Sequence, residues 1–209
     1  MDKVKIGVLG AGAISGIYFK NLTKVFTEVE IVAVCDLFVQ KAKEAAEEYK
    51  IPKVYGTMEE MLADEELEII LNLTRPNEHY KTTKAALLAG KHVYSEKPLA
   101  AVYEEGEELA ALAREKGLLL GGAPDTFLGA GIQTCRRLID DGFIGDVIGA
   151  QAQMVCHGHE GWHPAPEFYY QAGGGPRMDM GPYYMTALVN LVGRVKGVSG
   201  MCGKGFSQR

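Results

Sequence analysis

The feature that most constrains the fold is an apolar run that ends in a glycine-rich turn near the N-terminus. Val4–Leu9 has the length of one buried strand, and Gly10-Ala11-Gly12-Ala13-Ile14-Ser15 follows it directly. Gly10 permits a tight turn, and Gly12 has no side chain that would keep another group away from the backbone. The small Ser15 lets the helix that starts here pack closely against the strand. A strand, a tight turn and a helix in this order predict the first βα unit of a parallel sheet.

The same alternation of strand and helix continues along the chain. Further strands are expected at 30–35, 68–73, 92–94 and 118–120, and helices are expected up to residue 24 and over 41–50 and 103–116. Thr57 and Glu60 form a capping-box pattern, Asn77 is placed to cap a helix, and Gly90 is placed to end it. About six strands in this alternation predict a Rossmann-type, doubly wound parallel α/β sheet as a first domain at residues 1–123.

The pattern changes after Pro124, where a second domain is expected at residues 124–209. Helices are expected at 128–141 and 180–191, and strand-like runs at 146–156 and 195–199. Between them lies a loop rich in proline, histidine and aromatic residues, at 157–176. Two helices and two strands make a thin core. We therefore expect a partial α+β domain, whose exposed sheet edges would favour association.

Charge and cysteine usage narrow the class of protein. A net charge of −5 gives no support to binding of nucleic acid. No apolar run reaches the ~18–20 residues of a membrane span, and the first residues lead straight into a strand, so neither a membrane anchor nor a signal peptide is expected. The four cysteines are scattered without a CxxC pair. This favours reduced thiols in a cytoplasmic protein.

An acidic residue at the end of the second strand indicates what the glycine turn binds. The free N–H groups and the dipole at a helix N-terminus favour a pyrophosphate. Asp36 can accept hydrogen bonds from the adenosine ribose and would repel a 2′-phosphate, an effect that Lys41 would partly offset. The pattern predicts NAD as cofactor, with NADP as the alternative, held by Gly10, Gly12, Ala13, Ile14 and Asp36.

A lysine motif gives the most specific signal. Ala89-Gly90-Lys91-His92-Val93-Tyr94-Ser95-Glu96-Lys97-Pro98-Leu99-Ala100 places Lys97 just past the carboxyl end of a parallel strand, where ligands bind in open α/β sheets. Together with the glycine turn, Thr74-Arg75-Pro76-Asn77-Glu78-His79, Gly173-Gly174-Gly175 and Asp179-Met180-Gly181, it resembles the glucose–fructose oxidoreductase / inositol dehydrogenase / MocA (Gfo/Idh/MocA) family over essentially the whole chain.

The resemblance implies an NAD(P)-dependent dehydrogenase that acts on a hydroxyl of a sugar, polyol or inositol-like compound. It implies that Lys97 handles the proton of the substrate hydroxyl and that a cis peptide precedes Pro98. It also implies that residues 124–209 are part of a substrate and oligomerisation domain, that the protein is a homo-oligomer, either a dimer or a tetramer, and that the family's chains are longer than this one. Cofactor contacts are expected from Thr74, Pro76, Asn77, His79, Glu96 and Lys97.

The chain departs from the family pattern at one catalytic position. Asp179 and Gly181 match, but Tyr183 stands where the family histidine would be and Thr186 where a second acid would be. Tyr183 would move a proton if Lys97 lowers its pKa. Alternatively, His163 would reach in from its loop, where Trp162 offers an apolar face to a sugar ring. The expected catalytic residues are Lys97, Asp179, and Tyr183 or His163. Tyr183 is preferred because it occupies the position of the family histidine.

Other interpretations remain open at this stage. His157, His159 and His163 lie near Glu160, but their spacing is not that of a known metal motif, and we expect no metal site. Asp125 and Thr126 either touch the substrate or cap the following helix. Phe168-Tyr169-Tyr170 suggests core or interface. The alternative functions are an NAD-using lyase or glycosidase without net redox change, and a non-catalytic dinucleotide-binding fragment.

Overall fold

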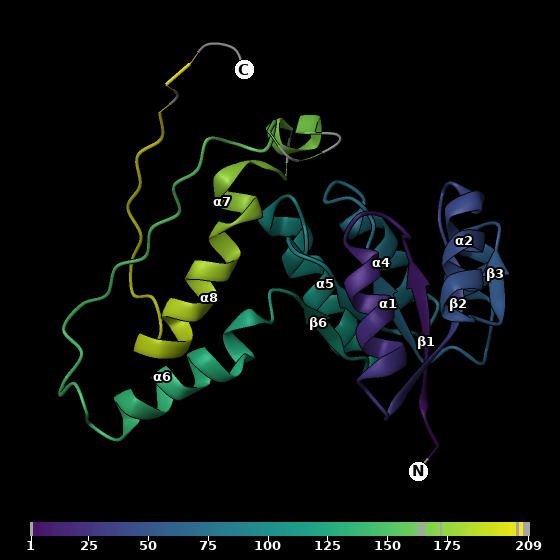
Figure 1. The fold of residues 1–209 in the computed structure, drawn as a ribbon, viewed down its shortest axis with the longest axis horizontal. Coiled ribbons are helices and arrows are strands. Elements are labelled where there is room, and N and C mark those ends of the chain that lie inside the picture. Colours follow the sequence, from purple (N-terminus) through teal and green to yellow (C-terminus); the bar gives the residue numbers. More distant parts are fainter. Residues whose placement is uncertain (1, 162, 164–165, 172, 204, 207–209) are drawn as a thin grey trace.

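A six-stranded parallel sheet forms the body of the molecule (Figure 1). The computed structural model describes residues 2–161, 163, 166–171, 173–203 and 205–206, so the role expected of Trp162 lies outside the described residues. The strands are β1 (Val4–Leu9), β2 (Val29–Cys35), β3 (Lys53–Tyr55), β4 (Ile69–Asn72), β5 (His92–Ser95) and β6 (Leu120–Gly122). Their order, β3-β2-β1-β4-β5-β6, confirms the doubly wound sheet.

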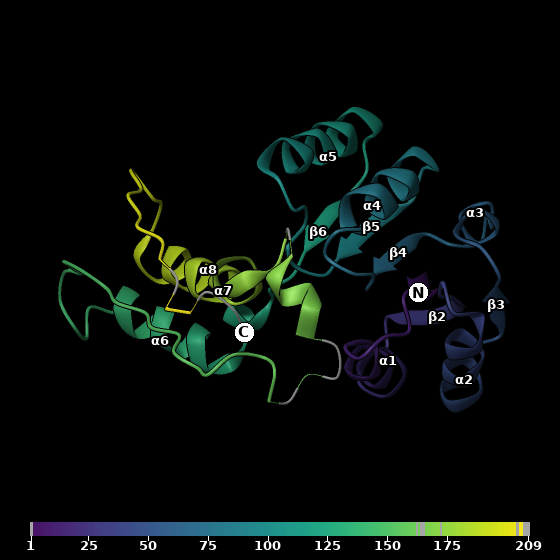
Figure 2. The ribbon, with the colours of Figure 1, turned by 90° about the horizontal axis from the view of Figure 1, so that it is seen from above.

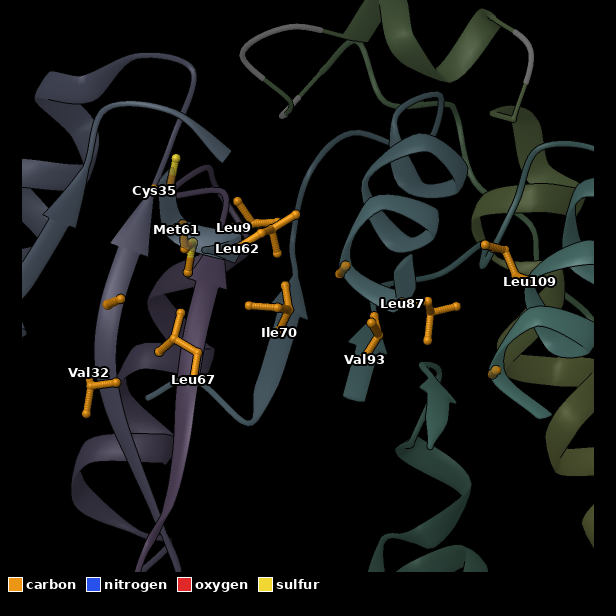
Figure 3. Packing of buried hydrophobic residues seen from close by; sticks show 13 residues of the cluster. Leu9, Val32, Cys35, Met61, Leu62, Leu67, Ile70, Leu87, Val93 and Leu109 are labelled. Atoms are coloured by element: carbon orange, nitrogen blue, oxygen red, sulfur yellow. The ribbon is translucent and has the colours of Figure 1, made fainter. Parts of the chain in front are cut away.

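Helices cover both faces of this sheet (Figure 2). They are α1 (Ser15–Lys24), α2 (Val39–Tyr49), α3 (Met58–Leu62), α4 (His79–Leu88) and α5 (Tyr103–Lys116). Alternate strand residues point to opposite faces, so the core divides in two. Phe19 of α1 and Ala42 of α2 pack on Ile6, Val8 and Val34. Leu87 of α4 and Leu109 of α5 belong to the opposite cluster, drawn in Figure 3.

The order of the strands creates a switch point beside β1. The chain moves outward from β1 toward β2 and β3 and then returns to β4 on the other side. Leu9 at the carboxyl end of β1 is level with Cys35 of β2 and Asn72 of β4. The loops that follow these strands therefore lie at one edge of the sheet, in the crevice where such folds bind ligands.

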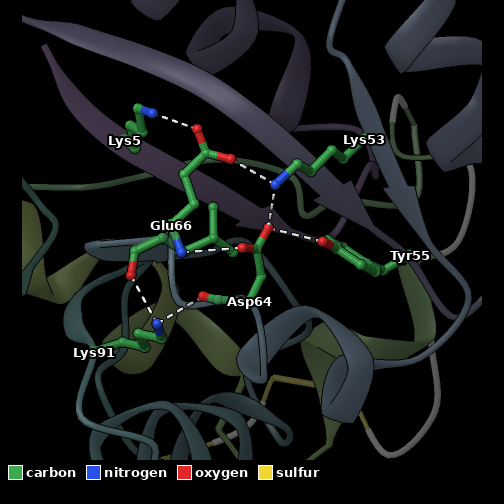
Figure 4. A network of polar contacts seen from close by, with 7 residues as sticks. Lys5, Lys53, Tyr55, Asp64, Glu66 and Lys91 are labelled. Carbon is green, nitrogen blue, oxygen red and sulfur yellow. Dashed lines mark hydrogen bonds and ion pairs between the residues drawn. The ribbon is translucent and has the colours of Figure 1, made fainter.

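A charged network lies at the opposite, amino edge of the sheet (Figure 4). Lys53 Nζ donates to Asp64 Oδ2 at 2.7 Å and to Glu66 Oε2 at 2.6 Å, and Lys5 also pairs with Glu66. The Tyr55 hydroxyl donates to Asp64 Oδ2 at 2.7 Å. Hydrogen bonds from Lys53 and Tyr55 lower the pKa of Asp64 to about 2. This network joins β1 and β3 to the loop before β4, at the edge away from the ligand crevice, which assigns it to stability.

The second unit is built on two helices that contact each other, with long extended segments beside them (Figure 1). Its elements are η1 (Thr126–Leu128), α6 (Ala130–Asp140), η2 (Pro166–Tyr170), α7 (Gly175–Asp179) and α8 (Gly181–Val192). Arg136 on α6 donates to the carbonyl oxygen of Asn190 on α8 at 2.8 Å, which ties the two helices together. The expected helices are thus present, the first of them divided at Gly129.

The two strand predictions in this unit are wrong. Neither 146–156 nor 195–199 is a strand, and the side chains of Ile148 and Val198 are almost completely exposed. A β-branched sequence becomes a strand only when a neighbour pairs with its N–H and C=O groups. Among the residues that the structure describes, no segment pairs with these two runs.

Local signals had mixed outcomes in the first unit. The Thr57–Glu60 capping box is present, and Gly90 follows the end of α4 with positive φ, as predicted. Gly117 ends α5 in the same way. The strand expected at 118–120 lies at 120–122 instead, because Leu118 N–H still bonds the end of α5 and Leu119 N–H bonds His92 Nδ1. The capping prediction for Asn77 is wrong, because its side chain bonds Glu78 and does not cap α4. Of the two interpretations of Asp125 and Thr126, the helix cap is wrong, because α6 begins after Gly129 and neither side chain caps it.

Candidate active site

The glycine turn connects β1 to α1 at the crevice edge. Gly10 has φ +102°, and a Cβ there would lie 2.6 Å from the carbonyl oxygen of Leu73, so the position requires glycine. A Cβ at Gly12 would meet no atom within 4 Å. Open space therefore lies against Gly12 at the start of α1, where Ile14 at the N-cap provides no side-chain cap. Uncapped N–H groups facing open space fit a pyrophosphate.

Asp36 is held against this turn. Its Oδ2 accepts a hydrogen bond from Ala11 N–H at 2.7 Å, and its Oδ1 accepts one from Phe38 N–H at 2.8 Å. These two bonds fix the carboxylate at the carboxyl end of β2, beside the start of α1. The position suits hydrogen bonds from ribose hydroxyls. The residues present thus fit the adenosine half of a dinucleotide.

A groove of about 360 Å³ runs between α1 and α2 next to the same turn. It is lined by Gly12, Ala13 and Gly16 on one side and by Lys41, Glu44 and Tyr49 on the other. Lys41 Nζ lies 5.2 Å from the centre of the Phe38 ring. One cation and acidic neighbours near Asp36 make this region a weak receptor for a 2′-phosphate, in agreement with the preference expected for NAD.

Buried side chains hold the loop after β4. Asn72 Nδ2 donates to Thr82 Oγ1 at 2.6 Å, and Asn72 Oδ1 accepts from Thr74 Oγ1 at 2.7 Å. Thr74, Pro76 and Asn77 follow at the crevice edge, where the sequence placed them. The pairing of Thr74 with Asn72 fixes the direction in which the loop leaves the sheet.

His79, which we expected to contact the cofactor, lies with both ring nitrogens against backbone carbonyl oxygens. Its side chain is buried, with Nδ1 2.6 Å from the Pro98 carbonyl oxygen and Nε2 2.9 Å from the Thr74 carbonyl oxygen. Carbonyl oxygens only accept hydrogen bonds, so both contacts are hydrogen bonds only when the ring carries two protons. His79 joins the Thr74 loop to the Lys97–Pro98 turn, a geometry that favours a positioning role.

Lys97 lies immediately after β5 and its amine reaches the second unit. Lys97 Nζ donates to Asp179 Oδ1 at 2.6 Å and to the Asp179 carbonyl oxygen at 2.9 Å. Both side chains are only 15% exposed. The peptide bond between Lys97 and Pro98 is cis, as predicted. The ion pair joins the edge of the sheet to the end of α7, and so brings together two of the residues expected to be catalytic.

Glu96 supports the lysine from the side of α1. Its Oε2 accepts a hydrogen bond from Lys97 N–H at 2.9 Å, and its Oε1 accepts one from the Tyr18 hydroxyl at 2.7 Å. Burial and this bond to Glu96 raise the pKa of Tyr18 far above its usual value. Tyr18 remains a proton donor to Glu96 and links α1 to the lysine turn. Sequence reasoning did not identify this tyrosine.

Tyr183 lies on the other side of Lys97, at the start of α8. Lys97 Nζ is 5.1 Å from the centre of the Tyr183 ring. Burial raises the pKa of the Tyr183 phenol, and the charge of Lys97 offsets only part of this rise. The expectation that Lys97 makes this phenol more acidic than usual is therefore wrong for the protein without ligands. A phenol that keeps its proton can donate a hydrogen bond to a substrate oxygen.

A histidine that sequence reasoning did not select completes the cluster. His159 Nε2 lies 3.1 Å from Asp179 Oδ2, and the His159 ring stacks on Tyr169 with 3.8 Å between ring centres. His163 instead packs on Phe168, with ring centres 4.8 Å apart. Thr186 Oγ1 bonds the Pro182 carbonyl oxygen within α8. His159 and Asp179 meet only through the tertiary fold, so no local spacing could have shown the pair.

In the described ranges, no group of three or more His, Cys, Asp or Glu side chains is arranged to hold a metal ion. Within the same ranges, every helix is too short or too polar to cross a membrane.

Comparison with protein families assigns both units. Residues 4–122 match the model of an oxidoreductase family with an NAD-binding Rossmann fold. Residues 132–208 match the model of a GFO/IDH/MocA C-terminal domain.

Three curated relatives are dehydrogenases. D-xylose dehydrogenase of Paenarthrobacter nicotinovorans is 30% identical over 76% of this chain and 42% of its own length. NADP(+)-dependent scyllo-inositol 2-dehydrogenase of Bacillus subtilis is 31% identical over 70% of this chain and 40% of its own length. Trans-1,2-dihydrobenzene-1,2-diol dehydrogenase of Mus musculus is 31% identical over 91% of this chain and 56% of its own length. The chain therefore spans about half the length of these relatives.

Solved structures share the fold. Myo-inositol dehydrogenase of Lactobacillus casei, in complex with NAD(H) and myo-inositol, has a TM-score of 0.65 and 27% identity over 69% of this chain and 43% of its own. Myo-inositol 2-dehydrogenase of Lactobacillus plantarum has a TM-score of 0.80 over 92% of this chain and 57% of its own. At 20% identity the second likeness shows the fold alone.

Proposed function

Because the chain belongs to the Gfo/Idh/MocA oxidoreductase family, we propose that it transfers a hydride between a nicotinamide cofactor and a sugar, polyol or inositol-like hydroxyl compound. The observation that carries this proposal is the ion pair between Lys97 and Asp179 at the carboxyl end of β5. It lies at the same edge of the sheet as the glycine turn and Asp36, where a dinucleotide fits.

One group of residues would bind the cofactor, and a second group would exchange a proton with the substrate. Gly12, the start of α1 and Asp36 would hold the cofactor, and its nicotinamide ring supplies or accepts the hydride when bound. Lys97 would donate to, or take the proton from, the substrate oxygen while Asp179 fixes its amine. Tyr183 would donate a second hydrogen bond to the substrate. The low exposure of Lys97 and Asp179 strengthens these interactions because little water competes for them.

The cofactor proposed is NAD, with NADP as the alternative. Asp36 at the end of β2 supports NAD, since its fixed carboxylate would repel a 2′-phosphate. The dehydrogenases similar to this chain act on sugars, inositols and diols, which supports a substrate with neighbouring hydroxyl groups.

The organisation of the whole protein is also part of the proposal. We place the domain boundary at 123–124, supported by family matches that end at 122 and begin at 132. A homo-oligomer is supported by the exposed apolar side chains Met185, Val189 and Val192 along α8. A cytoplasmic location is supported by the unpaired state of all four cysteines.

A turnover screen tests the proposal. The purified chain is mixed with NAD or NADP and with myo-inositol, scyllo-inositol, D-xylose, D-glucose or a cyclic diol, and the reduced nicotinamide is measured by absorbance. Reduction that depends on both the polyol and Lys97 would support the proposal. Conversion of a substrate without net reduction of the cofactor would contradict it and favour elimination or glycoside cleavage. Tight binding without any conversion would also contradict it.

A further inference from the structure

On the basis of the proposed function, we infer that His159 is a positioning residue that holds Asp179 and thereby sets how firmly Asp179 holds the amine of Lys97. The side chain of Asp179 offers two oxygens, and each faces one nitrogen: Oδ1 faces Lys97 Nζ at 2.6 Å and Oδ2 faces His159 Nε2 at 3.1 Å. Lys97 comes from the loop after β5, His159 from the loop before η2, and Asp179 from α7, so the site is assembled by tertiary packing.

Because this cluster is buried, the division of the Asp179 carboxylate between Lys97 and His159 affects how strongly each of them is held. The side chains of Lys97 and Asp179 are 15% exposed and that of His159 is 6% exposed. A carboxylate that accepts a hydrogen bond at one oxygen binds less strongly at the other, because part of its negative charge is already neutralised. The N–H of His159 thus weakens the hold of Asp179 on Lys97. Lys97 must leave Asp179 in part to exchange a proton with a substrate oxygen.

Packing around His159 explains why its ring stays in place. The ring lies flat on Tyr169 of η2, and Phe168 meets it edge-on at 6.3 Å between ring centres. The carbonyl oxygen of His159 accepts a hydrogen bond from His163 N–H at 2.9 Å. The aromatic segment Phe168–Tyr169, for which the sequence suggested core or interface, is therefore a platform for this histidine.

The glycine cluster before α7 brings this platform to Asp179. A Cβ at Gly174 would lie 2.5 Å from the Phe168 carbonyl oxygen and 2.6 Å from that of Tyr169. At Gly173, which has φ +83°, a Cβ would lie 3.3 Å from Ala101 Cβ and 3.6 Å from Pro76 Cβ. These glycines allow η2 to pack on the start of α7, and α7 on the loops that hold Lys97.

One chemical measurement detects how firmly Asp179 holds Lys97 without any need for turnover. The rate at which acetic anhydride acetylates Lys97 is followed by mass spectrometry over a pH series, in the absence of substrate. His159→Phe keeps a ring to stack on Tyr169 but has no N–H for Asp179. We expect acetylation of Lys97 to slow about 2- to 3-fold, because only a fraction of the strength of one charged hydrogen bond passes from His159 to Lys97. In the described part of the chain, the titratable groups next to Lys97 and His159 include Glu96, Tyr169, His163 and Tyr183.

Two further variants separate positioning from structure. His159→Gln keeps an N–H that can reach Asp179 and should return the acetylation rate toward that of the wild type. His157→Phe makes the same replacement at an exposed position two residues away and should change nothing. Thermal unfolding of each variant shows whether it folds. With a polyol substrate, His159→Phe should lower kcat far more than it changes KM, and should move the pH profile of kcat upward.

The outcomes distinguish this inference from the proposed function. Acetylation of Lys97 in folded His159→Phe at or above the wild-type rate would overturn the inference, even if the wild type reduces NAD with a polyol. Equal slowing by His157→Phe would overturn it too. Slower acetylation with rescue by His159→Gln would support the pairing, even if no substrate in the screen is oxidised, a result that would contradict the proposed function alone.

Discussion

Two glycines of the same turn should respond in opposite ways to the addition of one methyl group. Gly10→Ala would place a Cβ 2.6 Å from the Leu73 carbonyl oxygen at a φ of +102°. We expect a loss of about 2–5 kcal/mol of folding free energy, the sum of about 1–2 for the left-handed backbone and about 1–3 for the overlap. Gly12→Ala would place its Cβ in open space, so its stability should stay within about 0.5 kcal/mol of the wild type.

The open space beside Gly12 is where the pyrophosphate should lie, so the same methyl group should weaken NAD binding. We expect the Kd for NAD to rise at least about 10-fold, the equivalent of one lost hydrogen bond to a charged group. Urea denaturation measures the stability of both variants, and calorimetric titration measures the affinity of Gly12→Ala. NAD binding by Gly12→Ala that equals the wild type would refute the assignment of the turn, as would a Gly10→Ala protein of unchanged stability.

Three further predictions concern the sheet, the phenol and the choice of cofactor. Asp64→Asn should destabilise the protein by about 1–2 kcal/mol at pH 7. Because the folded pKa of Asp64 is lowered to about 2, this difference should be present above the unfolded pKa of about 4 and should disappear as pH falls toward 2 in denaturation series. Tyr183→Phe keeps the ring beside Lys97, so it should lower kcat about 10-fold or more with unchanged NAD affinity, and an undiminished kcat would reject the phenol as a donor. Asp36→Ser should weaken NAD and favour NADP in paired titrations, whereas an unchanged ratio of the two affinities would remove Asp36 from cofactor selection.

Local rules predicted the first unit well. The glycine turn, the alternation of strands and helices and the capping box at Thr57 depend on residues close in sequence, and all are present. Errors arose where a distant residue decides the outcome. The start of β6 depends on His92 of the neighbouring strand, because its Nδ1 accepts the hydrogen bond of Leu119 N–H. The run at 146–156 has strand-forming residues but no described partner.

The candidate site was predicted in its parts but not in its assembly. Gly10, Asp36 and Lys97 follow strands that end at one edge, a relation that the order of elements fixes. The pairing of Asp179 with His159 depends instead on the close packing of η2 on α7, which Gly174 permits. Sequence spacing contains no signal for that contact. The sequence suggested His163 only as the alternative to Tyr183, and it did not suggest His159.

The most direct test of the account is the behaviour of Lys97→Met, which removes the amine and keeps a side chain of similar length. Cofactor affinity is measured by calorimetric titration, and hydride transfer with the best polyol of the screen by reduced nicotinamide formed in a single turnover. The account predicts NAD binding equal to the wild type and loss of hydride transfer by at least about 100-fold, as expected when a proton-transfer group is removed. Undiminished hydride transfer by Lys97→Met would contradict it.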